Sequence, residues 1–208
     1  MSKAVLISIR PKWCEKIVNG EKTIEVRKTR PKLETPFKCY IYCTRDKHLA
    51  FMQNQTGTNL IACMDVDAAI PVGGAIENGK VIGEFTCDRI YEIRKRGIPE
   101  NFDYCYLSLN EWGNDDIETE IKAISASCVS KEELNAYGAK APLLYGWHIS
   151  DLRIYDTPKE LSEFKTLCRV DADCCACPYY NYTKMDCDGR VIGRPPQSWC
   201  YVDDVQAK

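Results

Sequence analysis

The sequence has no long apolar run and little histidine. The longest early apolar run, Ala4-Val5-Leu6-Ile7, is too short for a signal-peptide core or a membrane span, so we expect a cytoplasmic protein with no membrane partner. The 2 histidines, His48 and His148, give no support to chemistry that needs a histidine pair. There is also no internal repeat and no low-complexity tract. These absences leave the class of ordinary globular proteins.

The chain has almost no net charge, but its charges are unevenly distributed. A formal charge of -2 argues against a protein that coats nucleic acid by electrostatics alone. Residues 1–47 hold 12 Lys and Arg against 5 Asp and Glu, a net of +7, which leaves 16 against 25, or -9, for the rest. We expect any anionic ligand to meet the basic N-terminal quarter, and the alternative is a solvated basic surface without a partner.

Cysteine is abundant, with 13 residues in 208. An odd count in a chain long enough to bury a core does not suit a disulfide scaffold, which is typical of small secreted domains. Cys39, Cys43 and Cys87 fall within strand-like apolar runs, so we interpret them as small buried hydrophobic residues.

Local patterns predict a strand, a helix and a second strand near the N-terminus. The strand covers Ala4–Ser8, Pro11 opens the helix, and Gly20 stands where a left-handed C-terminal cap belongs. From Thr23 to Thr29 the period is two, which predicts an exposed strand face that carries Thr23, Glu25 and Arg27.

Similar patterns predict the remaining elements. Capping boxes at Ser130 and Thr157 predict two short helices. A helical turn is expected within His48–Gln53. Strands are expected at Phe37–Thr44, Val81–Ile93, Leu143–Tyr155 and Trp199–Val202.

The segment Gly20-Glu21-Lys22-Thr23-Ile24-Glu25-Val26-Arg27, a Gly-x-Lys-x-x-Glu-x-Arg motif placed after a strand and a short helix, resembles the ASCH family of the PUA-like superfamily, as found in prokaryotic and phage-type proteins. The resemblance continues through Leu144-Tyr145-Gly146-Trp147 and covers roughly residues 3–165. It implies an α+β fold, a mixed β-barrel of five to six strands with flanking short helices. Residues 1–165 would form this domain, and residues 166–208 a cysteine-rich insert and a closing C-terminal strand.

The motif offers two cations around a carboxylate, which suits a polar anionic ligand. PUA-like relatives bind RNA or modified bases, so the resemblance implies binding of RNA or a (modified) nucleotide. Trp13, Tyr40 and Tyr42 could stack a base, although Trp13 suits a core anchor better. We expect Lys22→Ala and Arg27→Ala to weaken binding and to leave the fold intact. The candidate ligand-binding residues are Ser8, Arg10, Lys12, Lys22, Glu25, Arg27 and Tyr42.

Two other functions stay open. One branch of the ASCH family hydrolyses N4-acetylcytidine with a lysine, a threonine three residues later and a downstream glutamate; here the threonine position holds Glu25, and Glu132 or Glu133 is the counterpart of the glutamate. The catalytic candidates are therefore Lys22, Glu25 and Glu133, and enzyme activity is left undecided. A protein-interaction module would be favoured if Lys22 and Arg27 were wholly engaged in internal ion pairs.

The C-terminal segment predicts a structural zinc site. Residues 168–187 hold five of the thirteen cysteines, including a Cys-x-x-Cys pair, Cys174 and Cys177. With Cys168 and Cys187 these thiols could form a four-thiolate tetrahedron, for which Cys175 and Cys200 are substitutes. The alternative is a set of reduced, unpaired thiols.

Overall fold

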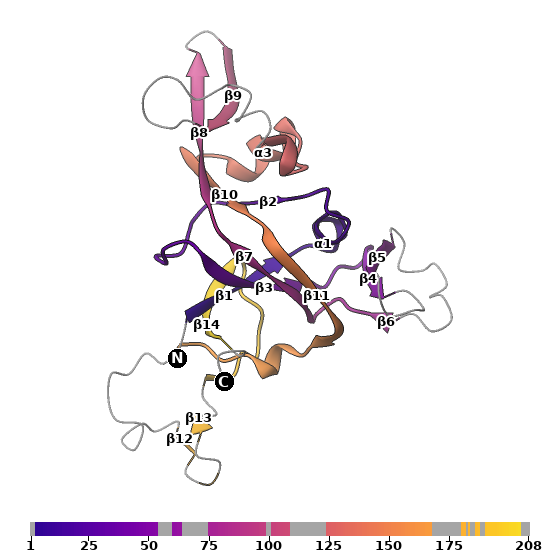
Figure 1. Ribbon diagram of the computed structural model, residues 1–208. Helices are drawn as coiled ribbons and strands as arrows, with labels where there is room; N and C mark the ends of the chain where they lie inside the picture. Colours follow the sequence, from indigo (N-terminus) through magenta and orange to yellow (C-terminus); the bar gives the residue numbers. More distant parts are fainter. Residues whose placement is uncertain are drawn as a thin grey trace. The chain divides into compact units, whose positions relative to one another are not determined.

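The chain forms two compact units (Figure 1). The computed structural model describes residues 3–53, 60–63, 75–98, 101–108, 124–167, 180–181, 183, 186–187 and 190–204. Unit 1 comprises residues 1–15, 38–85 and 153–208, and unit 2 comprises residues 16–37 and 86–152. Among the helices of these described ranges, none is long and apolar enough to cross a membrane.

Unit 1 is built around a five-stranded sheet of order β11-β7-β3-β1-β14. Its strands are β1 (Lys3–Ile9), β3 (Phe37–Cys43), β7 (Val81–Cys87), β11 (Ser150–Lys159) and β14 (Trp199–Asp203). A three-stranded sheet of order β5-β4-β6 contains β4 (Ala50–Gln53), β5 (Leu60–Cys63) and β6 (Ala75–Ile76). The short strands β12 (Tyr180–Asn181) and β13 (Asp186–Cys187) form a hairpin pair.

Strand β1 lies inside its sheet because both of its edges are paired. It runs parallel to β3, with Leu6 opposite Tyr40, and antiparallel to β14, with Leu6 opposite Cys200. In Figure 1 the indigo β1 and the yellow β14, from opposite ends of the chain, lie side by side. Residues 4–9 are all buried, as expected for a continuous apolar run whose two faces are both covered.

The core of unit 1 contains one strong polar contact. Tyr155, on β11, is buried and donates a hydrogen bond of 2.6 Å to Oε2 of Glu84 on β7. Burial, together with this bond to a carboxylate, raises the pKa of the Tyr155 hydroxyl above its ordinary value. The two strands approach closely at Gly83, where an added Cβ would lie 2.5 Å from the carbonyl oxygen of Arg153.

Unit 2 contains a four-stranded sheet of order β2-β10-β8-β9. Its strands are β2 (Ile24–Arg27), β10 (Leu143–His148), β8 (Ile90–Ile98) and β9 (Asn101–Ser108). Helix α1 (Pro11–Val18) leads into this unit and α3 (Lys131–Gly138) lies within it, whereas the 3-10 helix η1 (Leu161–Glu163) belongs to unit 1. The core of unit 2 packs Ile24, Val26, Ile93, Leu134 and Leu144 together.

Several elements confirm the predictions from the sequence. Helix α1 begins at Pro11, and Gly20 after its end has a φ of 75°, the left-handed conformation expected of a cap. The capping box of α3 is formed, because the Ser130 hydroxyl accepts the N–H of Glu133 and the Glu133 carboxylate accepts the N–H of Ser130. The last predicted strand is present as β14.

Other local predictions are wrong. Residues 50–53 form β4 instead of a helical turn. The predicted strand Val81–Ile93 is two strands, because the chain leaves β7 at Cys87 and enters a different sheet as β8 at Ile90. The second capping box opens no helix at Thr157, since β11 continues to Lys159 and only the single turn η1 follows.

The α+β class is confirmed, but the described residues form no closed barrel. The five-stranded sheet has two ends, β11 and β14, and the four-stranded sheet ends at β2 and β9. A barrel requires the two end strands of one sheet to pair with each other, which is not the case for either sheet in the described part of the chain. The domain boundary predicted at residue 165 stays a prediction.

We predict that Tyr155→Phe lowers the free energy of unfolding by about 1–3 kcal/mol, because the buried Glu84 carboxylate loses its hydroxyl donor. Denaturant unfolding would measure the change. Tyr137→Phe, at a ring that is 39% exposed, is the control and should alter stability by less than about 0.5 kcal/mol. Equal stability of the Tyr155 variant and the wild type would contradict the prediction.

Candidate functional site

The motif residues are positioned by the turn that joins α1 to β2. The N–H of Gly20 donates to the Ile17 carbonyl at 3.0 Å, and the N–H of Lys22 donates to the Lys16 carbonyl at 2.9 Å. The left-handed Gly20 permits this reversal at no steric cost. Lys22 therefore arrives at a fixed place immediately before β2.

The Lys22 side chain is buried within unit 2, with 2% of its surface exposed. Its Nζ donates to the carbonyl oxygens of Ile24 at 2.7 Å and Ser127 at 2.6 Å. Oε2 of Glu25 lies 3.3 Å from the same nitrogen. An ammonium group has three protons, and these three oxygens supply an acceptor for each.

Glu25 connects the two cations of the motif. Its Oε1 lies 2.9 Å from Nη2 of Arg27, while its Oε2 faces Lys22. Glu25 and Arg27 are 5% and 8% exposed. We call Lys22, Glu25 and Arg27 the buried triad. A charged cluster with so little solvent is stabilised by its internal contacts, because each ion has lost most of its hydration.

The prediction that Glu25 and Arg27 lie on an exposed strand face is therefore wrong. All four residues of β2 are buried. The physical reason lies in a distant segment, residues 124–127, which approaches the start of β2. The N–H of Thr23 donates to the Ala126 carbonyl at 2.9 Å, next to the Lys22 contact with Ser127. The expectation that Lys22→Ala leaves the fold intact is revised accordingly.

The other predicted ligand-binding residues lie in unit 1. The Ser8 hydroxyl donates to the Pro196 carbonyl at 2.6 Å, and Tyr42 is 3% exposed within the core of that unit. Arg10 is exposed, and Nζ of Lys12 lies 4.4 Å from the centre of the Trp13 ring. The seven predicted residues are thus divided between the two units, with only the triad brought together by printed sequence spacing and by contacts within unit 2.

The catalytic candidate Glu133 is exposed on α3. Its carboxylate accepts the N–H of Ser130 at 3.1 Å, which is the capping-box contact of that helix. Glu132, the other candidate, is also exposed, and its pKa is lowered by a hydrogen bond from its own backbone. Both acids lie in the first turn of α3, where negative charge stabilises the helix.

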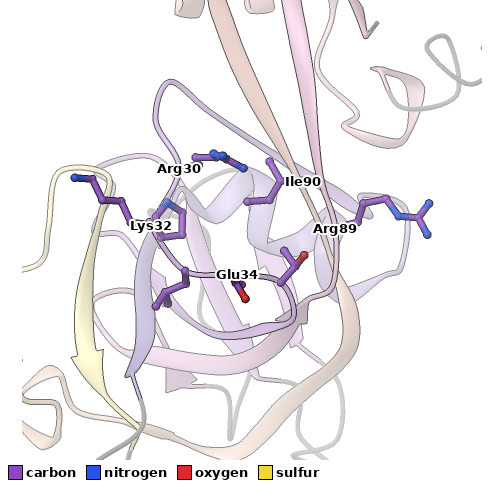
Figure 2. A pocket seen from close by; sticks show the side chains of 8 residues that line it. Arg30, Lys32, Glu34, Arg89 and Ile90 are labelled. Carbon is purple, nitrogen blue, oxygen red and sulfur yellow. The ribbon is translucent and has the colours of Figure 1, made fainter. Parts of the chain in front are cut away.

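Unit 2 also contains a groove that the sequence did not predict. It has a volume of about 710 Å³ and is lined by residues 30–35, which connect β2 to β3, and by Arg89 and Ile90, where β8 begins. Figure 2 shows Arg30, Lys32 and Arg89 arranged around this space with Glu34. Three cations against one carboxylate give this basic groove a net positive charge. The excess of positive charge in residues 1–47 was the sequence signal for it.

The cations of the basic groove contact tyrosines of the neighbouring strands. Cζ of Arg30 lies 5.9 Å from the centre of the Tyr145 ring on β10. Arg89 lies at the same distance from the Tyr91 ring on β8, and its Nη1 is 3.4 Å from the Tyr91 hydroxyl. Such cation–π contacts hold guanidinium groups in place at an otherwise open surface.

An aspartate–histidine pair lies beside Arg89. Nδ1 of His148 is 2.6 Å from Oδ1 of Asp88, and the N–H of His148 donates to the Arg89 carbonyl at 2.9 Å. The hydrogen bond from His148 holds the pKa of the Asp88 carboxyl below its ordinary value. Asp88 therefore remains ionised near neutral pH and orients the imidazole ring.

The zinc prediction stays a prediction. Cys168, Cys174 and Cys177 lie outside the described residues, as does the substitute Cys175. Cys187 is in β13, opposite Tyr180. Within the described ranges, no three potential metal-ligating side chains come together.

We predict that Lys22→Met lowers the free energy of unfolding by about 3–5 kcal/mol, because it leaves Glu25 buried with one cation fewer and two carbonyls without their donor. The matched control is Lys16→Met, which breaks a largely exposed pair with Glu21 at 2.9 Å and should cost less than about 1 kcal/mol. Guanidinium unfolding measures both, and similar losses in the two variants would show that the triad does not support the fold.

Neither protein-family models nor curated proteins give a match to the sequence. Among solved structures, the crystal structure of ASCH from Zymomonas mobilis is similar over 97% of this chain and 88% of that one, with a TM-score of 0.51 and 16% identity. Two single-substitution variants of the Zymomonas mobilis protein give TM-scores of 0.44 and 0.49, with 17% and 16% identity, over 77% and 97% of this chain and 77% and 89% of theirs. The chain therefore has the fold of an ASCH domain, as the Gly-x-Lys-x-x-Glu-x-Arg motif predicted.

Proposed function

We propose that this protein binds RNA or a (modified) nucleotide through unit 2, and that the Gly-x-Lys-x-x-Glu-x-Arg motif frames the site. The observation that carries the proposal is the basic groove, an open space of about 710 Å³ lined by Arg30, Lys32 and Arg89. Its volume is in the range of sites that hold one small ligand. Its charge suits the phosphate groups of a nucleotide.

The lining side chains provide the chemistry that phosphate recognition requires. Arg30, Lys32 and Arg89 are all exposed, so their charged groups can meet a ligand without prior unfolding. A guanidinium can hold a phosphate with two parallel hydrogen bonds, and the lysine adds a point charge. Glu34 and the peptide groups of residues 30–35 offer acceptors and donors for a base or a sugar hydroxyl.

The buried triad contributes by fixing the strand from which the groove begins. Arg27 is the last residue of β2, and the groove starts at Arg30. Arg27 is opposite Tyr145 in the pairing of β2 with β10, and Arg30 packs over the Tyr145 ring. Any shift of β2 would therefore displace Arg30. In this proposal Lys22, Glu25 and Arg27 shape the site, and Ser8, Arg10, Lys12 and Tyr42 stay proposed contacts from unit 1.

The double variant Arg30→Ala/Lys32→Ala should weaken binding of a short single-stranded RNA by about 10-fold to 100-fold, since each charge-assisted hydrogen bond contributes about 1.5–3 kcal/mol. The dependence of log Kd on log salt concentration should become shallower by about 1 per phosphate contact removed. Fluorescence anisotropy at several salt concentrations measures both quantities.

The matched control is Lys140→Ala, an exposed lysine of unit 2 outside the basic groove, which should leave the affinity unchanged. If the double variant and the control bound RNA equally well, the basic groove would not be the binding site. No detectable binding by the wild-type protein at low salt would end the proposed function itself.

A second candidate function is hydrolysis of N4-acetylcytidine or a similar modified nucleoside. The observation in its favour is a desolvated Lys22 ammonium 3.3 Å from the Glu25 carboxylate, the lysine–acid pairing that such an enzyme needs. Against it, Glu25 occupies the position of the threonine in the hydrolytic relatives, and all three protons of Lys22 face internal acceptors.

We predict weak or no turnover of N4-acetylcytidine, because a carboxylate in the threonine position cannot provide the hydroxyl. Incubation with the purified protein followed by chromatography would detect cytidine. Rapid release of cytidine that disappears in the folded Lys22→Arg variant would instead establish the hydrolase, with Lys22 at its centre.

A further inference from the structure

We propose that the nucleic acid bound by unit 2 is single-stranded, with its phosphates in the basic groove and its unpaired bases against the tyrosines beside it. This inference rests on the proposed function and specifies the form of its ligand. It is carried by three cation–tyrosine pairs within unit 2: Lys28 with Tyr137, Arg30 with Tyr145, and Arg89 with Tyr91.

The three pairs share one design. Each cation comes from a connection at a strand end, close to or within the basic groove, and each ring comes from a different element, α3, β10 or β8. Nζ of Lys28 lies 5.2 Å from the Tyr137 ring centre, and the two arginine pairs are at 5.9 Å. Lys28 precedes Arg30 by two residues, so one connection supplies two of the three cations.

All six side chains reach solvent. The three cations are exposed, Tyr137 is 39% exposed, and Tyr91 and Tyr145 are half-buried. A partly buried tyrosine ring is already held in place, so a base that stacks on it loses little further side-chain entropy. A guanidinium plane over a ring can also take a base on its own outer face. The pairs thus form a surface where cations and flat apolar groups alternate.

Alternating cations and aromatic rings match a single strand better than a duplex. A single strand offers a phosphate and an unpaired base at every nucleotide, so both kinds of group find a partner. In a duplex the bases are stacked on one another, and only the phosphates could reach this surface. The tyrosines would then contribute nothing to affinity. Binding by stacking is also tolerant of sequence, because every base has an aromatic face.

The competing explanation is that the three pairs only pack the loops onto the sheet. Packing and ligand stacking lead to different measurements. If the rings merely support the loops, replacing one would lower stability and would weaken single-stranded and duplex RNA to the same degree. If they stack bases, replacement would affect single-stranded RNA selectively.

The experiment measures anisotropy with a fluorescein-labelled 12-nucleotide RNA that has no self-complementarity, alone and annealed to its complement. For the wild-type protein we expect the single strand to bind at least about tenfold more tightly than the duplex. Tyr145→Leu should weaken single-strand binding by about 5-fold to 100-fold, the loss of one stacked base, and leave duplex binding nearly unchanged. Tyr145→Phe retains the ring and should lose much less affinity than the leucine variant.

Thermal unfolding checks that each variant is folded. Tyr137→Leu provides a second test at a more exposed ring, in case Tyr145→Leu does not fold. Lys140→Ala again serves as the unaffected control. Equal wild-type affinity for single strand and duplex, or equal losses for both in the leucine variants, would overturn this inference and leave the basic groove as a phosphate site. Absence of RNA binding altogether would overturn the proposed function as well.

Discussion

The burial of one ammonium group imposes order on much of unit 2. Lys22 has lost its water, and removing an ammonium ion from water costs several kcal/mol unless its protons find acceptors. Two of the acceptors, on Ile24 and Glu25, are local, but the third is the carbonyl of Ser127, 105 residues along the chain. The turn after α1, strand β2 and the segment that carries Ser127 must therefore be in place together.

The basic residues near the N-terminus fall into two groups with different work. Lys22 and Arg27 are buried and hold β2, whereas Lys28, Arg30 and Lys32 follow directly on an exposed connection. The same local charge excess thus serves structure first and recognition second. A rigid buried strand is a suitable base for such a loop, because a binding site needs side chains whose positions are set before the ligand arrives.

Local signals in the sequence predicted local structure well. Pro11 and Gly20 mark α1, Ser130 and Glu133 mark α3, and the motif identified the fold. Features that depend on distant segments could not be predicted. The alternation in residues 23–29 is compatible with an exposed face, and only the approach of residues 124–127 makes that face buried. Similarly, the cations of the basic groove were visible as a charge excess, but their arrangement depends on how β8 begins beside the loop.

The pairing of β1 with β14 has a consequence for synthesis on the ribosome. Val5 lies opposite Tyr201, so one edge of β1 has no partner until nearly two hundred more residues have been made, which takes roughly 10–40 s at ordinary elongation rates. During that time an apolar strand edge is open to pairing with other chains. Parallel pairing with β3 can occupy only the opposite edge. Nascent chains should therefore depend on chaperones until the last strand has left the ribosome.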